Sequence, residues 1–136
     1  MTSFPLKIVT PDGLIFDGQA EMVKVRSTEG DMAVMAHHIN CVVPLGMGTA
    51  AIVTGGQRKI AACIGGMLSV TNGECTLVPT TFEWAEDIDI ARAEKAHATA
   101  LEILQSKKDD EVAAKLAEAK LRRALIRKNV AEQYKG

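Results

Sequence analysis

Aromatic side chains are scarce in this sequence, at 4% of its 136 residues. We therefore expect a core built from aliphatic side chains and alanine. Long apolar runs are also missing, because the longest one, residues 60–70, is interrupted by Gly65 and Gly66 and is too short to span a bilayer. Residues 1–7 lack the basic-then-apolar pattern of a secretory signal. If the protein works at a membrane, we expect a partner to hold it there.

Cysteine is equally sparse, and the sequence contains no CxxC pair. An odd number of cysteines argues against a disulfide framework, so we expect reduced, buried thiols in a reducing compartment at Cys41, Cys63 and Cys75. The formal net charge is −1, which excludes a chain that binds nucleic acid through its overall charge. The residues from Lys115 onward are nevertheless clearly basic.

Glycine-containing turns divide the first part of the chain into short segments with the composition of strands. Residues 6–9 are rich in β-branched side chains and stop at the turn sequence of residues 10–13. Residues 22–27 alternate apolar and polar side chains, as a strand with one wet face does. The pairs Gly55-Gly56 and Asn72-Gly73 predict tight hairpins. Such closely spaced turns indicate a β-sandwich or barrel.

The periodicity changes after residue 84, where apolar residues begin to recur at helical spacing. The first predicted helix carries Ala93, Ala96, Ala100 and Ile103, supported by Leu101 and Leu104. After a polar break at residues 106–110, a second helix over about residues 110–133 carries Ala114, Ala117, Leu121, Ala124 and Leu125. Two amphipathic runs with a short break predict an antiparallel helical hairpin. Because its apolar stripe is mostly alanine, we expect it to pack weakly on the strands and to occupy two positions.

Four acidic residues lie where the two halves meet, in the expected last loop and first helical turn: Glu83, Glu86, Asp87 and Asp89. Acids at a helix N-terminus can cap the free N–H groups and suit the helix dipole, which is one interpretation. The other is a ligand site, since Asp89 and Arg92 share a helix face and a helix start favours anions. The pattern alone leaves both interpretations open.

Two adjacent histidines, His37 and His38, lie in the polar loop of residues 36–40 and raise the hypothesis of a metal site. Even with Cys41 nearby, the set of ligands is incomplete, so we predict no metal site. We interpret His38 as a side chain that anchors the loop by hydrogen bonding. The sequence also shows no nucleophile–base pair and no glycine loop with phosphate-binding spacing, so a catalytic role is not expected.

In this order and spacing, several motifs together make the chain resemble the epsilon subunit family of the bacterial F-type ATP synthase, whose mitochondrial counterpart is called delta. They are LKIVTPDG at 6–13, EGDMAVM at 29–35, His38, GGMLSV at 65–70 and IDIARA at 88–93. The resemblance covers nearly the whole length. It implies an α+β fold, with an N-terminal antiparallel β-sandwich over residues 1–84 and a C-terminal antiparallel α-helical hairpin over residues 85–136.

The resemblance also implies the function, which is that of a non-catalytic rotor subunit in the central stalk of the proton-translocating enzyme. The sandwich is expected to bind the gamma subunit and the c-subunit ring, with His38 among the partner-binding residues. The hairpin is expected to regulate ATP hydrolysis. The protein would then be peripheral to the cell membrane on its cytoplasmic side, associated with the membrane only through the complex and not with nucleic acid.

Family members that bind ATP carry an I/L-D-x-x-R-A signature, which residues 88–93 match. The resemblance thus implies a regulatory site for ATP, with or without Mg, but no required cofactor. Its residues would be Glu83, Ile88, Asp89, Arg92, Ala93, Arg123 and Arg127. The chain departs from the family pattern at Ala33, Asn40 and Thr99, and Thr99 stands where ATP-binding relatives carry another arginine. A loss of that charge is expected to weaken phosphate binding.

The basic second helix carries the expected regulatory contact. With the hairpin extended, Arg122, Arg123 and Arg127 would reach an acidic segment of the alpha/beta catalytic head and block hydrolysis. A solvated basic face is the alternative interpretation of Arg122 and Arg123. A second functional hypothesis is a free-standing ATP-binding sensor or adaptor, with the sandwich as scaffold and the hairpin as clamp. Co-purification with gamma distinguishes the two hypotheses.

Overall fold

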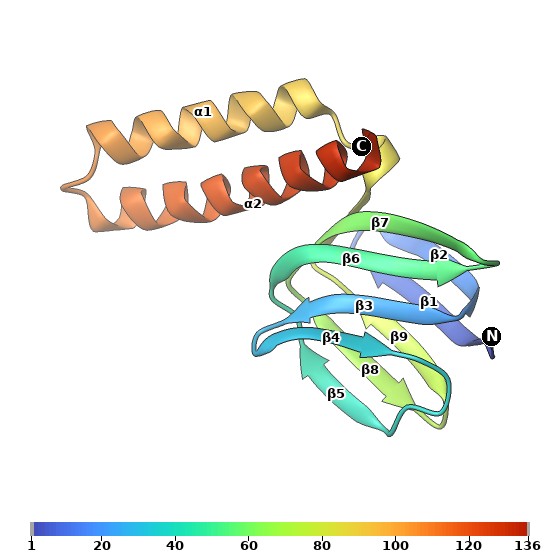
Figure 1. Cartoon of the computed structure of the whole chain (residues 1–136). Helices are drawn as coiled ribbons and strands as arrows, with labels where there is room; N and C mark the ends of the chain where they lie inside the picture. The colour runs from blue at the N-terminus through green and yellow to red at the C-terminus, as the bar shows by residue number, and fades with distance from the viewer. Residues whose placement is uncertain (1, 136) are drawn as a thin grey trace. The chain divides into compact units, whose positions relative to one another are not determined.

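The structure is a computed structural model that describes residues 2–135 (Figure 1). The chain divides into two compact units, of which the first ends at Trp84 and the second begins at Ala85. The first unit is made of strands and the second of helices. The predicted fold class, a β-sandwich followed by a helical hairpin, is confirmed.

The strand unit consists of two five-stranded sheets. The first sheet has the order β2 (Gly13–Ala20), β1 (Phe4–Thr10), β9 (Glu74–Val78), β8 (Met67–Thr71) and β5 (Cys41–Pro44). The second sheet has the order β10 (Thr81–Trp84), β7 (Gln57–Ile64), β6 (Met47–Thr54), β3 (Met22–Ser27) and β4 (Gly30–Val34). The chain crosses between the sheets several times, so neighbours in space are often far apart in sequence.

One strand pair departs from the antiparallel pattern expected of this unit. β1 and β9 run parallel, with Leu6 opposite Cys75 and Ile8 opposite Leu77. The other paired strands in the described part of the chain are antiparallel. A parallel neighbour cannot be joined by a tight turn, and here the seven strands β2 to β8 lie between the two strands along the chain.

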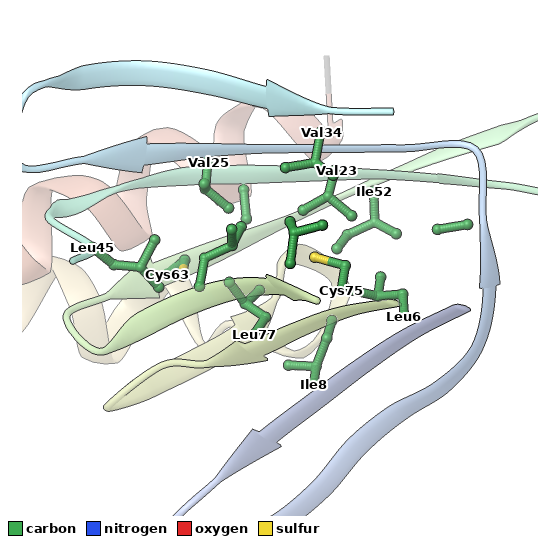
Figure 2. Packing of buried hydrophobic residues seen from close by; sticks show 14 of the residues in the cluster. Leu6, Ile8, Val23, Val25, Val34, Leu45, Ile52, Cys63, Cys75 and Leu77 are labelled. Atoms are coloured by element: carbon green, nitrogen blue, oxygen red, sulfur yellow. The ribbon is translucent and has the colours of Figure 1, made fainter. Parts of the chain in front are cut away.

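The core between the sheets is mainly aliphatic, as the scarcity of aromatic residues predicts, but Phe4 is buried in it and Phe16, Phe82 and Trp84 pack against it. Alternate side chains of β1 point inward, and Leu6 and Ile8 are 1% and 0% exposed. Figure 2 shows these two side chains gathered with others from both sheets, including Val23, Ile52 and Leu77. Burial of each large aliphatic side chain contributes about 1.5–3 kcal/mol relative to its exposure.

Glycine turns connect the strands as predicted at residues 55–56 and 72–73, where β6 joins β7 and β8 joins β9. Gly66 has a different task at the crossing from β7 to β8. Its φ is +93°, and an added Cβ would lie 2.0 Å from the carbonyl oxygen of Val78. Only glycine fits a backbone that is both left-handed and this close to another strand.

The expected last loop of the sandwich is in fact a strand, so the prediction was wrong there. β10 pairs with β7, with Phe82 opposite Cys63 and Trp84 opposite Ala61. The rings of Phe82 and Trp84 meet edge to face, with centroids 4.9 Å apart and planes at 90°. Because β10 is short and borders an acidic run, its aromatic alternation was not recognised as a strand.

The second unit begins with the short 3₁₀ helix η1 (Ala85–Asp87) and continues with α1 (Ile90–Ser106) and α2 (Glu111–Lys135). The two long helices lie side by side and antiparallel, which confirms the predicted hairpin (Figure 1). Alanines at seven-residue spacing are buried in it: Ala93 and Ala100 on α1, Ala117, Ala124 and Ala131 on α2. None of the helices within residues 2–135 is long and apolar enough to cross a membrane.

Two leucines depart from the predicted apolar stripe. Leu101 and Leu125 are each 39% exposed, whereas the sequence pattern predicts both on the apolar sides of the helices. The seam is narrow because it is made of alanines, so the larger side chains beside it remain outside. The expectation of an alanine-lined contact is confirmed, while the two leucines do not complete it.

Candidate functional site

A side chain caps the N-terminus of α1. Asp89 is the N-cap residue, and its Oδ1 accepts a hydrogen bond from the backbone N–H of Arg92 at 3.1 Å. Glu86 and Asp87 precede it in η1. The capping interpretation of the acidic cluster is therefore confirmed for Asp89. Glu83 does not belong to this turn, because it lies in β10 of the strand unit.

The hairpin brings most of the predicted ATP residues to one end. Ile88, Asp89, Arg92 and Ala93 lie at the start of α1, and η1 packs against α2. Because the helices are antiparallel, the second half of α2, which carries Arg123 and Arg127, lies beside that start (Figure 1). Glu83 belongs to the other unit. The grouping of the six hairpin residues thus follows from the topology alone.

The small side chain of Ala93 has a structural reason. It is 4% exposed in the seam between the helices, where a larger side chain would separate them. Ile88 is also buried, at 8%. Closeness to a ligand is therefore not needed to explain an alanine at position 93, and its role in ATP binding stays a prediction.

Arginines supply positive charge at this end of the hairpin. Arg92, Arg122 and Arg123 are exposed, and Arg127, one turn after Arg123, is half-buried. From Lys115 onward the sequence has seven basic and two acidic residues. Guanidinium groups one turn apart can hold a phosphate or a carboxylate group together. Thr99 is exposed on α1 and offers no charge.

The loop that carries His38 is held by side-chain hydrogen bonds. The Nδ1 of His38 lies 2.8 Å from the carbonyl oxygen of Ile39, and since a carbonyl can only accept, Nδ1 carries the proton. Asn40 Oδ1 accepts a hydrogen bond from the backbone N–H of Asn72 at 2.8 Å, which ties the loop to the β8–β9 hairpin. The hydrogen bond of His38 stays within the loop, so the loop-anchoring interpretation of His38 stays a prediction, and the observed tie to another element is made by Asn40. Among residues 2–135, no three His, Cys, Asp or Glu side chains come together as a metal-binding group.

An apolar strip, which the sequence analysis missed, lies on the outward face of the first sheet. Pro44 lies opposite Met67, and Met67 lies opposite Val78, so these side chains share one face with Val42 across β5, β8 and β9. Val42 is 66% exposed, Met67 43% and Val78 45%. The sequence did contain a signal for this strip. Residues 41–44 are all apolar, whereas a strand with one face in water has a polar residue at every second position.

The cysteines differ in accessibility. Burial raises the pKa of Cys63 to about 12. Burial, and then the proximity of Cys41, raise the pKa of Cys75 to about 11. The prediction of buried thiols is thus confirmed for these two, whereas Cys41 is half-buried, with its Sγ 3.9 Å from His38 Nδ1.

Two family models match the chain. One, described as "ATP synthase, Delta/Epsilon chain, beta-sandwich domain", matches residues 3–85. The other, described as "ATP synthase, Delta/Epsilon chain, long alpha-helix domain", matches residues 86–132. Together they cover nearly the whole sequence and confirm the resemblance found in its motifs.

Individual relatives agree with these models. A protein of Bacillus velezensis named "ATP synthase epsilon chain" is 38% identical over 96% of this chain and 98% of its own length. One of the same name from Shouchella clausii is 35% identical over 100% of this chain and 99% of its own. Among solved structures, a chain of the Euglena gracilis mitochondrial ATP synthase OSCP/F1/c-ring complex matches with a TM-score of 0.79 and 25% identity, over 90% of this chain and 77% of that one.

Proposed function

The chain belongs to the delta/epsilon family of ATP synthase chains, and from that premise we propose that it is the epsilon subunit of an F-type ATP synthase. It is a non-catalytic subunit of the central stalk and turns with the rotor. In this proposal it couples proton flux to ATP synthesis by transmitting rotation. The complex holds it at the cytoplasmic side of the cell membrane.

The apolar strip on the first sheet is the observation that carries the proposed rotor contact. A contiguous set of exposed Val42, Pro44, Met67 and Val78 is unusual for a protein surface in water and typical of one that a partner covers. The loop of His38 leads directly into β5, so His38 borders the strip. We assign the strip to the gamma subunit, with the c-subunit ring bound by the same β-sandwich.

Binding of the full-length chain to its gamma subunit tests this assignment. A Met67→Asp or Val42→Asp substitution places a charge in the contact and is expected to weaken binding about tenfold or more. Leu14→Asp is the matched control, because Leu14 is 60% exposed but lies on β2, at the opposite edge of the same sheet. Equal affinities for all three variants and the unchanged chain would contradict the assigned surface.

The hairpin is the regulatory part in this proposal. Its alanine seam leaves Leu101, Val112, Leu116 and Leu125 exposed, which suits helices that exchange one set of partners for another. Held against the sandwich, the hairpin permits hydrolysis. Extended along gamma, it presents the basic face of α2 to an acidic segment of the alpha/beta head and blocks hydrolysis.

Charge reversal on α2 tests the regulatory contact. A triple Arg122, Arg123 and Arg127→Glu variant is expected to raise ATP hydrolysis by the assembled enzyme, because attraction becomes repulsion. Since Arg127 is half-buried, an Arg122→Glu/Arg123→Glu variant provides a second test at exposed positions. Lys108→Glu in the loop between the helices is the control. An unchanged hydrolysis rate in both arginine variants would contradict the basic-helix mechanism.

ATP is proposed as a ligand of the hairpin, bound through Asp89, Arg92, Arg123 and Arg127 in the permissive position. A ligand shifts such an equilibrium only as far as its affinities for the two positions differ. Thr99 supplies no phosphate contact, so we expect weak binding. Calorimetric titration with MgATP tests this, and the absence of heat at millimolar ligand would reject it.

A further inference from the structure

A hollow of about 230 Å³ lies on the surface of the strand unit. Three segments that are far apart in sequence form its walls. Thr2 precedes β1, Glu21 lies between β2 and β3, and Met35, Ala36 and His37 follow β4. A hollow lined from three segments of one unit has a shape that the sandwich fixes.

Glu21 is the charged group of this hollow, and the backbone positions it closely. It is the single residue between β2 in one sheet and β3 in the other, and its N–H donates to the carbonyl oxygen of Val53 at 2.7 Å. Its Oε1 accepts a hydrogen bond from the backbone N–H of Gly56 at 3.0 Å. A carboxylate has about four acceptor positions, so Glu21 keeps capacity for a further donor.

The charge of Glu21 is not compensated within the described chain. Among residues 2–135 its hydrogen bond comes from Gly56, and no ion pair joins it to a lysine, arginine or histidine. A half-buried carboxylate in this state attracts a cation, because a charge-assisted hydrogen bond is shorter and stronger than one between neutral groups.

The other residues that line the hollow determine which kind of cation fits there. Met35 and Ala36 provide apolar surface, and His37, held in the left-handed region with φ of +67°, and Thr2 add polar groups at the rim. Lysine and arginine combine an apolar stem with a charged head, which matches apolar walls around one carboxylate. The hollow is smaller than the pockets of about 300–1,000 Å³ that enclose whole small-molecule ligands, so one side chain is the appropriate occupant.

We propose that this hollow receives a lysine or arginine side chain that projects from the partner subunit covering the apolar strip. The inference rests on the proposed rotor function and names the chemistry of one contact in it. Continuity supports a polypeptide as the source: the loop that forms part of the hollow carries Ile39, which is 78% exposed, and runs on into β5 with Val42. A free amine lacks such a neighbouring surface and would gain little from an open hollow.

The test uses the full-length chain and its full-length gamma subunit in a calorimetric titration. Glu21→Gln removes the charge and keeps an oxygen acceptor for the Gly56 N–H. We expect about a tenfold to hundredfold loss of affinity, together with a shallower dependence of binding on salt. Asp12→Asn is the matched control, because Asp12 is an exposed acid in the β1–β2 turn, at the far end of β2 from Glu21.

A second variant keeps the proposal testable even if the Glu21→Gln variant does not fold correctly. Met35→Lys changes a residue that is 50% exposed and supplies a cation from within the chain, so it is expected to weaken gamma binding to a similar degree. Gamma affinity unchanged in both variants, while Met67→Asp weakens it, would overturn the basic side chain in the hollow and leave the rotor assignment intact. Failure of the unchanged chain to bind gamma would instead count against the proposed function, and with it this inference.

Discussion

The carboxylate of Asp89 and the backbone N–H of Arg92 are joined by a hydrogen bond of 3.1 Å across the first turn of α1. The same aspartate belongs to the motif from which ATP binding was predicted. One side chain thus has an observed structural task and a proposed ligand task. An alanine substitution at position 89 cannot separate them, because it removes both.

Serine at position 89 separates the two tasks. Asp89→Ala is expected to lower the free energy of unfolding by about 1 kcal/mol, whereas Asp89→Ser, which also places a good N-cap there, should change it little. If the carboxylate binds ATP, both variants lose the heat of MgATP binding. Thermal unfolding measured by circular dichroism and calorimetric titration check the two effects. An Asp89→Ser variant that binds MgATP like the unchanged chain would remove Asp89 from the proposed site.

The alanine seam predicts a position-specific sensitivity to size. Ala100 is 1% exposed between the helices, so Ala100→Leu should destabilise the hairpin by about 1–3 kcal/mol through overpacking. Ala98 is exposed on the same helix, and Ala98→Leu should be nearly neutral. Helical circular dichroism during urea unfolding measures the difference. Similar stabilities of the two leucine variants would argue that the seam is loosely packed.

Alanine substitutions at two glycines with positive φ can distinguish the stability cost of backbone strain from that of steric overlap. Gly66 (φ +93°) and Gly73 (φ +83°) share a conformation, but an added Cβ meets the Val78 carbonyl at 2.0 Å only at Gly66 and open space at Gly73. Gly73→Ala should cost about 1–2 kcal/mol and Gly66→Ala about 3 kcal/mol or more. The fluorescence of Trp84, the one tryptophan of the sequence, reports unfolding in urea. Equal midpoints would show that the β7–β8 crossing can shift to accept a side chain.

The thiols should react in a fixed order. With a pKa of about 12 for Cys63 and about 11 for Cys75, almost no thiolate forms at either residue near pH 8. The half-buried Cys41 is therefore expected to react first with iodoacetamide, and the other two only after unfolding. Peptide mapping by mass spectrometry identifies the labelled residue. Labelling of Cys63 in the folded protein would contradict the closed core.

The same raised pKa values predict a loss of stability in alkali. The folded state holds the Cys63 and Cys75 protons more tightly than the unfolded chain, whose thiols titrate near 9.0. Their contribution is complete below that pH and decreases as the pH rises toward 11 and beyond. Urea midpoints between pH 8 and pH 11 should fall less in Cys63→Ala and Cys75→Ala variants than in the unchanged chain. An identical slope in all three proteins would assign the alkaline loss to other groups.

Local chemistry explains which parts of the fold were predictable. Asn72-Gly73 marks its hairpin because left-handed backbone needs such residues, and the alanine spacing marks the helices because their contact repeats every seven residues. The pairing of Leu6 with Cys75 leaves no local trace, since neither strand contains information about the other. The same reason hid the apolar strip, because the outward position of Met67 depends on its register with Val78.

The candidate sites follow the same division. The cap at Asp89 could be predicted because it depends on four consecutive residues. The hollow beside Glu21 could not, because the residues that line it come from three separate segments. Glu83 was predicted in a loop, and its place in β10 depends on the opposing Ala62 of β7.

The parallel pairing of β1 with β9 affects how the protein folds while the ribosome synthesises it. β1 is synthesised first, yet its neighbour on one side is complete only when Val78 has emerged. The nascent sandwich must therefore wait with an open edge, and long-range pairing of this kind is intrinsically slow. The helices of the hairpin leave last, after β9 and β10, so the strand domain has all its partners, and can close, while α1 and α2 are still being synthesised.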